Sequence, residues 1–267
     1  MGTFNQHGIS IGYTDAGSGP ALTLVHGHPF DRSMWRPQIE HFAAAGYRVI
    51  APDLRGYGET TVVPGRTRWE FFGRDVAALL DHLGIARTVL AGLSMGGQIV
   101  LECHRLFPDR LSGLVLAATS ARAETPQGRQ NRTEMAERLL REGMAPYATE
   151  VLRKMVSPTA PDTVSDHVLA MMRGTSPVGA SAALRGRAER PDYVEMLAKI
   201  KVPTLVVVGT EDEFTPATEA EFLAAHIPGA QLAIIDGAAH LPNLEQPEEF
   251  NIALEKFLHL TVTESHS

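Results

Sequence analysis

Val89-Leu90-Ala91-Gly92-Leu93-Ser94-Met95-Gly96-Gly97 is the stretch that decides the fold of this 267-residue chain. A run of β-type apolar residues leads into Gly-Leu-Ser-Met-Gly, and apolar residues then recur at helical spacing from 98 to 106. A strand, a sharp turn that carries serine and a helix form the arrangement that exposes a nucleophilic serine. The first amides of such a helix face any negative charge that develops on a bound substrate. The stretch therefore predicts Ser94 as a nucleophile and the backbone N–H of Met95 as a donor to an oxyanion.

Strand-like and helix-like patterns alternate on both sides of this stretch. Nearly continuous apolar runs, such as residues 21–25, are typical of strands that are covered on both faces in a parallel sheet. The alternation predicts an α/β fold with a mostly parallel, doubly wound sheet. The strands are expected over residues 8–14, 21–25, 47–52, 89–93, 111–118, 204–208 and 231–235, and the main helices over 69–83, 218–226 and 247–258.

Residues 121–195 differ from the rest because they contain several helical segments, broken by glycine and proline, and no convincing strand. We expect them to form a helical cap above the carboxyl ends of the strands, where ligands of such sheets bind. The core then comprises residues 1–120 and 196–260, and residues 261–267 form a flexible tail. The helices of the cap carry methionine, leucine and aromatic residues, from which we take Met144 and Tyr147 as candidate substrate contacts.

The composition argues against several classes of function. The formal net charge is −7 without a concentrated basic patch, so nucleic acid is not expected as a partner. No apolar run approaches the ~18 residues of a membrane span, and residues 1–7 show no secretory signal. Cys103 is the only cysteine, so we expect a cytoplasmic protein without an internal disulfide. The sequence has no His/Cys cluster at metal spacing and no Gly-x-Gly-x-x-Gly after a strand, so neither a metal nor a cofactor is expected.

A serine hydroxyl needs a base within hydrogen-bond reach, and that base needs an orienting acid. His240 follows the predicted strand 231–235 in a loop of small residues, which leaves room for a substrate. Asp212 follows the preceding strand, 204–208. We therefore expect Ser94, Asp212 and His240 to form a catalytic triad. Glu211 and Glu213 are the competing acids.

The loops that carry these groups supply further candidates. The loop after residue 25 reads His26-Gly27-His28-Pro29, and we expect the backbone N–H of His28 to be the second oxyanion donor beside that of Met95. Phe30 and Trp35 follow this loop, and Leu241 follows His240. These three residues are additional candidate substrate contacts.

The chain resembles the α/β-hydrolase-fold serine hydrolases. The resemblance rests on five segments, which are His26-Gly27-His28-Pro29, Asp53-Leu54-Arg55-Gly56-Tyr57-Gly58, Gly92-Leu93-Ser94-Met95-Gly96-Gly97, Gly209-Thr210-Glu211-Asp212 and Gly237-Ala238-Ala239-His240. It implies an eight-stranded sheet with the cap inserted after the sixth strand. Within the superfamily the chain looks most like small capped esterases, cofactor-free haloperoxidase/perhydrolase-like esterases and enol-lactonase-like hydrolases. Asp53 and Arg55 match a family motif that is usually structural, so they are assigned no catalytic role.

The resemblance implies hydrolysis of an ester or lactone of a small, mainly apolar molecule through an acyl-enzyme. Ser94 argues against haloalkane dehalogenases and epoxide hydrolases of this fold, because they use Asp as the nucleophile. The triad alone does not separate ester hydrolysis from perhydrolysis, amide or lactam hydrolysis, or cleavage of a carbon–carbon bond. A ligand sensor with slow turnover and a non-catalytic binding module are further alternatives. The sequence allows either a monomer or a homodimer.

Overall fold

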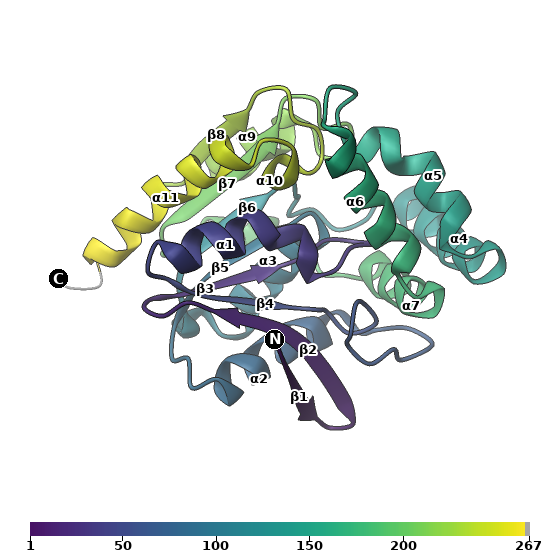
Figure 1. The fold of residues 1–267 in the computed structure, drawn as a ribbon, viewed down its shortest axis with the longest axis horizontal. Helices are drawn as coiled ribbons and strands as arrows, with labels where there is room; N and C mark the ends of the chain where they lie inside the picture. The colour runs from purple at the N-terminus through teal and green to yellow at the C-terminus, as the bar shows by residue number, and fades with distance from the viewer. Residues whose placement is uncertain (265–267) are drawn as a thin grey trace.

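The computed structural model describes the backbone of residues 1–264 and the side chains of residues 1–261. Its centre is one eight-stranded sheet with the strand order β1-β2-β4-β3-β5-β6-β7-β8, which confirms the expected α/β-hydrolase architecture (Figure 1). The β1–β2 and β2–β4 pairs are antiparallel, and all the other neighbouring pairs are parallel. The strands are β1 (Gly2–Gln6), β2 (Ile9–Ala16), β3 (Ala21–Val25), β4 (Arg48–Pro52), β5 (Thr88–Leu93), β6 (Leu111–Ala117), β7 (Thr204–Gly209) and β8 (Gln231–Ile235).

The sequence pattern identified β2 to β8, which include both fully buried strands and the mostly exposed β8. Every residue of β5 and of β7 is buried, as expected for central strands of a parallel sheet. The sequence pattern did not indicate β1, because this edge strand alternates between half-buried and exposed positions and carries few apolar residues. His7 and Gly8 join β1 to β2 with φ angles of 48° and 81°, the two positive values that a tight hairpin turn requires.

Helices α1 (Arg36–Ala44) and α11 (Pro247–Glu264) cover one face of the sheet (Figure 1). Phe42 of α1 and Phe257 of α11 are fully buried in one apolar cluster with strand residues such as Leu24. The short 3₁₀ helix η1 (Arg32–Trp35) precedes α1.

The opposite face is covered by α2 (Trp69–His82), α3 (Met95–Leu106) and α9 (Ala217–His226). Ile99 of α3 and Leu90 of β5 are fully buried in the cluster that lies under these helices. Helices on both faces make the sheet doubly wound, as the alternating pattern predicted.

Helix α11 is longer than the sequence pattern indicated. It continues to Glu264, and Thr261 is buried, so residues 261–264 are helical and do not begin the expected flexible tail. The remaining part of that predicted tail, residues 265–267, lies outside the described residues.

Four helices lie side by side between β6 and β7, after the sixth strand as predicted (Figure 1). We call them the cap helices: α4 (Pro126–Glu142), α5 (Met144–Met155), α6 (Asp162–Gly174) and α7 (Pro177–Ala188). The short helix α8 (Val194–Leu197) leads back to β7.

Helix α7 of the cap packs closely against core loops at Gly179 and at Gly186. A Cβ atom on Gly179 of α7 would lie 1.9 Å from the carbonyl oxygen of Gly56, in the loop that follows β4, so glycine is required there. In the described part of the chain, no helix combines the length and the apolar character that crossing a membrane requires.

Candidate active site

Ser94 occupies the sharp turn between β5 and α3. Its backbone has φ 55° and ψ −114°, a strained conformation that costs about 1–3 kcal/mol and persists only where the surroundings enforce it. The surroundings that enforce it are backbone atoms packed closely against the flanking glycines. A Cβ atom on Gly92 would lie 2.3 Å from the carbonyl oxygen of Gly96, and one on Gly96 would lie 2.2 Å from that of Val25. Only glycine fits at these two positions, and the turn they permit places Ser94 on the wall of a cavity.

His240 and Asp212 meet at the carboxyl ends of β8 and β7. The Nδ1 atom of His240 lies 3.0 Å from Oδ1 and 2.9 Å from Oδ2 of Asp212. Both side chains are buried, and His240 borders the same cavity as Ser94. An ionised carboxylate only accepts hydrogen bonds, so Nδ1 carries the proton and the lone pair of neutral His240 is left on Nε2.

Three donors besides His240 hold the Asp212 carboxylate. Oδ1 accepts the backbone N–H groups of Phe214 at 2.8 Å and Thr215 at 3.0 Å, and Oδ2 accepts the Thr215 hydroxyl at 2.6 Å. Burial alone would raise the pKa of Asp212, but the bonds from His240 and Thr215 outweigh it and hold that pKa below its ordinary value. Glu211 and Glu213 are exposed, so among the three acids of this loop only Asp212 contacts His240.

The two predicted oxyanion donors belong to segments that end at the same edge of the sheet. Val25 of β3 pairs in parallel with Gly92 of β5, so the loop with His28 begins beside the turn with Ser94. Met95 is the first residue of α3, and its N–H therefore has no acceptor within the helix. These positions suit the two amides for binding one oxygen atom near Ser94.

The His28 side chain takes part in the cavity wall as well. One ring nitrogen, Nδ1, lies 2.7 Å from the Tyr57 hydroxyl, and the other, Nε2, is buried without a hydrogen-bond partner. Burial, followed by the charges of Arg187 and Arg132, holds the pKa of His28 well below its ordinary value. His28 is therefore neutral at physiological pH.

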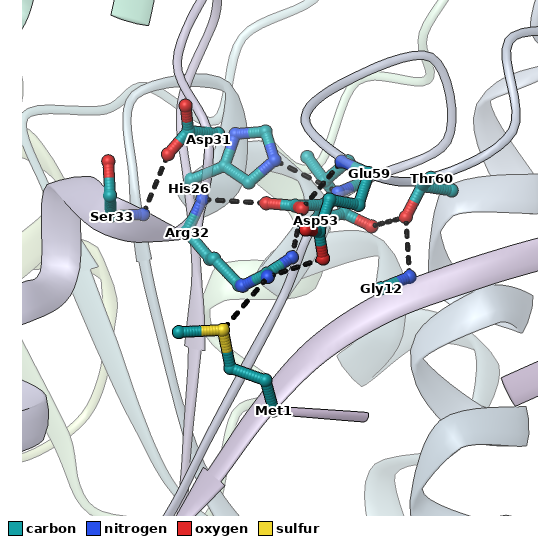
Figure 2. Close-up of polar contacts among 10 residues, drawn as sticks. Met1, Gly12, His26, Asp31, Arg32, Ser33, Asp53, Glu59 and Thr60 are labelled. Atoms are coloured by element: carbon teal, nitrogen blue, oxygen red, sulfur yellow. Dashed lines mark hydrogen bonds and ion pairs between the residues drawn. The ribbon is translucent and has the colours of Figure 1, made fainter. Parts of the chain in front are cut away.

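A buried polar network fixes the loop that carries His28 (Figure 2). Asp53 accepts the backbone N–H groups of Arg32 at 2.8 Å and Glu59 at 2.9 Å, and it also pairs with the Arg32 guanidinium. His26 accepts the backbone N–H of Leu54 at 2.9 Å on Nε2. The network ties the loops after β3 and β4 together, which is a structural role for Asp53.

The cavity has a volume of about 340 Å³ and lies between the cap helices and the loops that carry Ser94, Phe214 and His240. Four residues expected at the site border it, namely Ser94, His240, His28 and Tyr147. The other lining residues are Glu124, Gly128, Asn131, Arg132, Met135, Val151, Met155, Leu184, Arg187, Phe214 and Thr215.

Four of the expected substrate contacts do not line this cavity. Phe30, Trp35 and Leu241 are fully buried in the core cluster that packs under α1 and α11. Met144 is buried in a small cluster that joins α4, α5 and α7. Each of them packs against neighbouring apolar side chains.

Glu245 is a site residue that the sequence pattern did not indicate. Its buried carboxylate accepts the backbone N–H groups of Ala239 and Leu241, each at 3.1 Å, on either side of His240. It also accepts the N–H of Ser157 at 2.7 Å, in the segment that follows α5. Glu245 therefore links the loop of His240 to the cap.

Comparisons with known proteins show the family and the fold of the chain. Residues 20–247 match the family described as the alpha/beta hydrolase fold. The chain is 31% identical over 261 residues to 3-oxoadipate enol-lactonase 2 of Acinetobacter baylyi, covering 95% of this chain and 94% of that protein. A thermophilic esterase from Thermogutta terrifontis, solved with malate bound, superposes with a TM-score of 0.93 at 39% identity, with 97% of each chain covered. The enol-lactonase from Burkholderia xenovorans gives a TM-score of 0.88 at 28% identity, with 97% of this chain and 100% of that one covered.

Proposed function

Because this chain belongs to the α/β-hydrolase fold family, we propose that it is a serine hydrolase that cleaves carboxylic ester or lactone bonds in small, mainly apolar substrates. Its relatives named above are hydrolases of these two bond types. Family membership alone does not fix a reaction, because one fold supports many activities. The proposal therefore depends on the site.

The contact between His240 and Asp212 is the observation that carries the proposal. A buried carboxylate that holds Nδ1–H of a histidine leaves Nε2 as the only basic atom of that ring. His240 and Ser94 border one cavity, and Ser94 adopts a strained turn that a merely structural serine would not require. These are the parts needed to activate a serine hydroxyl.

The reaction proceeds in two halves. Ser94 Oγ attacks the carbonyl carbon while Nε2 of His240 takes its proton, and the carbonyl oxygen becomes an oxyanion between the amides of Met95 and His28. The imidazolium of His240, stabilised by Asp212, then protonates the leaving alkoxide, and an acyl-Ser94 ester remains. Water attacks this ester with His240 again as the base, which releases the acid and restores Ser94.

The cavity suits a small acyl or alcohol group. Its volume of about 340 Å³ lies near the lower end of ordinary ligand pockets. Met135, Val151, Met155 and Leu184 supply apolar contacts, and the exposed Phe214 lies with its ring centroid 5.1 Å from that of His240. Short and medium chains are therefore expected to be hydrolysed faster than long ones.

Hydrolysis of a chain-length series of p-nitrophenyl esters and a panel of small lactones tests the proposal. The wild type is compared with Ser94→Ala and with the control Ser112→Ala, a partly buried serine of β6 outside the cavity. We expect turnover that falls by at least about a thousand-fold in Ser94→Ala and is unchanged in Ser112→Ala. Equal turnover in Ser94→Ala and the wild type would refute the proposal.

A further inference from the structure

One end of the cavity carries more positive than negative charge. Arg132 and Arg187 line it, and the guanidinium of Arg190 donates to the carbonyl oxygen of Arg187. Glu124 is the carboxylate of this cluster, and it pairs with Arg132 at 2.7 Å and with Arg190 at 2.6 Å. The cluster thus holds three guanidinium groups and one carboxylate, and that carboxylate pairs with only two of them.

Arg187 is the member of the cluster that lacks an ionic partner. Its Nε–H donates to Oε1 of Gln98 at 2.8 Å, and within the described residues no carboxylate lies at ion-pair distance from its guanidinium. Its four terminal N–H bonds donate to no protein acceptor there, although the side chain is partly buried. Burial, and then the charges of Arg132 and Arg190, lower the pKa of Arg187 well below its ordinary value, so its positive charge is poorly compensated.

The bond to Gln98 places this charge close to the reacting atoms. Gln98 lies on α3 four residues after Ser94, which is about 6 Å along the helix axis. Arg187 and Ser94 also border the same cavity. A group bound to Arg187 is therefore within the reach of a small molecule whose carbonyl lies at Ser94.

We infer that the substrate carries a carboxylate, which Arg187 binds with Arg132 beside it while the scissile ester or lactone carbonyl lies at Ser94. This inference rests on the proposed function and narrows its substrate class to monoesters of dicarboxylic acids and to lactones that bear a carboxylate. A guanidinium with free terminal N–H groups binds a carboxylate through two parallel hydrogen bonds. The apolar residues Met135, Met155 and Leu184 would contact the hydrocarbon chain between the two ends.

Two esters that differ only in charge test this inference. Monomethyl adipate presents the carboxylate, and the methyl ester of equal length that ends in an acetyl group is its neutral counterpart. We expect the wild-type kcat/KM to favour the adipate ester by about 10- to 100-fold, the range that one charged hydrogen-bonded contact supplies. Arg187→Met should remove this preference by slowing only the charged ester, and Arg187→Lys should retain part of it.

Arg185→Met is the matched control, because Arg185 lies on the same helix but pairs with Glu137 outside the cavity. It should keep the full preference. Equal kcat/KM for the two esters in the wild type, or an equal loss for both in Arg187→Met, would overturn the inference. The rate of fluorophosphonate labelling at Ser94 shows that each variant is folded and competent.

Calorimetry with adipate separates this inference from the proposed function. Binding to the wild type that weakens about 10-fold or more in Arg187→Met supports the carboxylate site even if no ester is hydrolysed. Turnover of neutral esters without any binding of adipate would leave the hydrolase proposal intact and refute the carboxylate site.

Discussion

Replacing Asp212 with asparagine tests how the site selects the base. The two oxygens of Asp212 are not equivalent, because Oδ1 accepts two backbone N–H groups whereas Oδ2 accepts the Thr215 hydroxyl, which can rotate. The amide oxygen of the introduced asparagine must therefore take the Oδ1 position. Its NH₂ group then lies where Oδ2 lay, 2.9 Å from Nδ1 of His240, and donates to that atom.

This donation forces the proton of His240 onto Nε2, the atom that has to accept the proton of Ser94. A triad locked in the wrong tautomer loses roughly a thousand- to ten-thousand-fold in kcat. The loss corresponds to about 4–5.5 kcal/mol of transition-state stabilisation. Most hydrogen bonds of the loop survive the substitution, so the free energy of unfolding should change by only about 1 kcal/mol.

Steady-state kcat/KM for the best ester and urea unfolding are measured for Asp212→Asn, Asp212→Ala, Glu211→Gln and Glu213→Gln. Alanine leaves either tautomer open, so Asp212→Asn should be no more active than Asp212→Ala. Glu211→Gln and Glu213→Gln should lower kcat/KM by less than about two-fold. If folded Asp212→Asn retains a tenth or more of the activity, Asp212 does not select Nε2 of His240 as the base.

Other perturbations test the supports of the site. Glu245→Gln places an NH₂ group opposite a backbone N–H that the carboxylate now accepts. Urea unfolding should therefore show a free energy of unfolding that is lower by about 1–3 kcal/mol. The exposed control Glu249→Gln should lower it by less than about 0.5 kcal/mol. Gly96→Ala puts a Cβ atom 2.2 Å from the carbonyl oxygen of Val25, so it should destabilise the fold by about 3 kcal/mol or more and slow fluorophosphonate labelling in any folded fraction. The depressed pKa of Asp212 means that the folded state binds its proton less tightly than the unfolded state does. The ionised Asp212 therefore stabilises the fold fully above about pH 4, and this stabilisation is lost as the pH falls through the pKa of the folded state. The difference in the free energy of unfolding between wild type and Asp212→Asn should consequently become smaller in acid.

The sequence was sufficient to predict the fold and where the three residues of the proposed triad lie along it. Ser94, Asp212 and His240 each follow an apolar strand, and the carboxyl ends of parallel strands meet at one edge of the sheet. The local pattern around each residue therefore determines where it lies. The edge strand Gly2–Gln6 was missed because Phe4 is its only large apolar residue, too little for an apolar pattern.

The lining of the cavity could not be predicted in the same way. Arg187 and Glu124 belong to the cap segment, where a charged residue in sequence looks like part of a solvated surface. That both line one cavity depends on how α7 packs against α4 and the segment before it, and no local sequence pattern records this packing. Leu241 shows the opposite case, since it adjoins His240 in sequence but is fully buried in the core.

Mass spectrometry during turnover tests whether Ser94 is the residue that becomes acylated. The wild type is mixed with a slowly hydrolysed ester, quenched in acid and digested, and Ser94→Ala is treated in parallel. If Ser94 is the nucleophile, one acyl group per chain is found on the peptide that carries Ser94. It forms and decays at rates consistent with kcat and is absent in the variant. Turnover without an acylated Ser94, or an acyl group that forms on another residue at the rate of turnover, would contradict this role of Ser94.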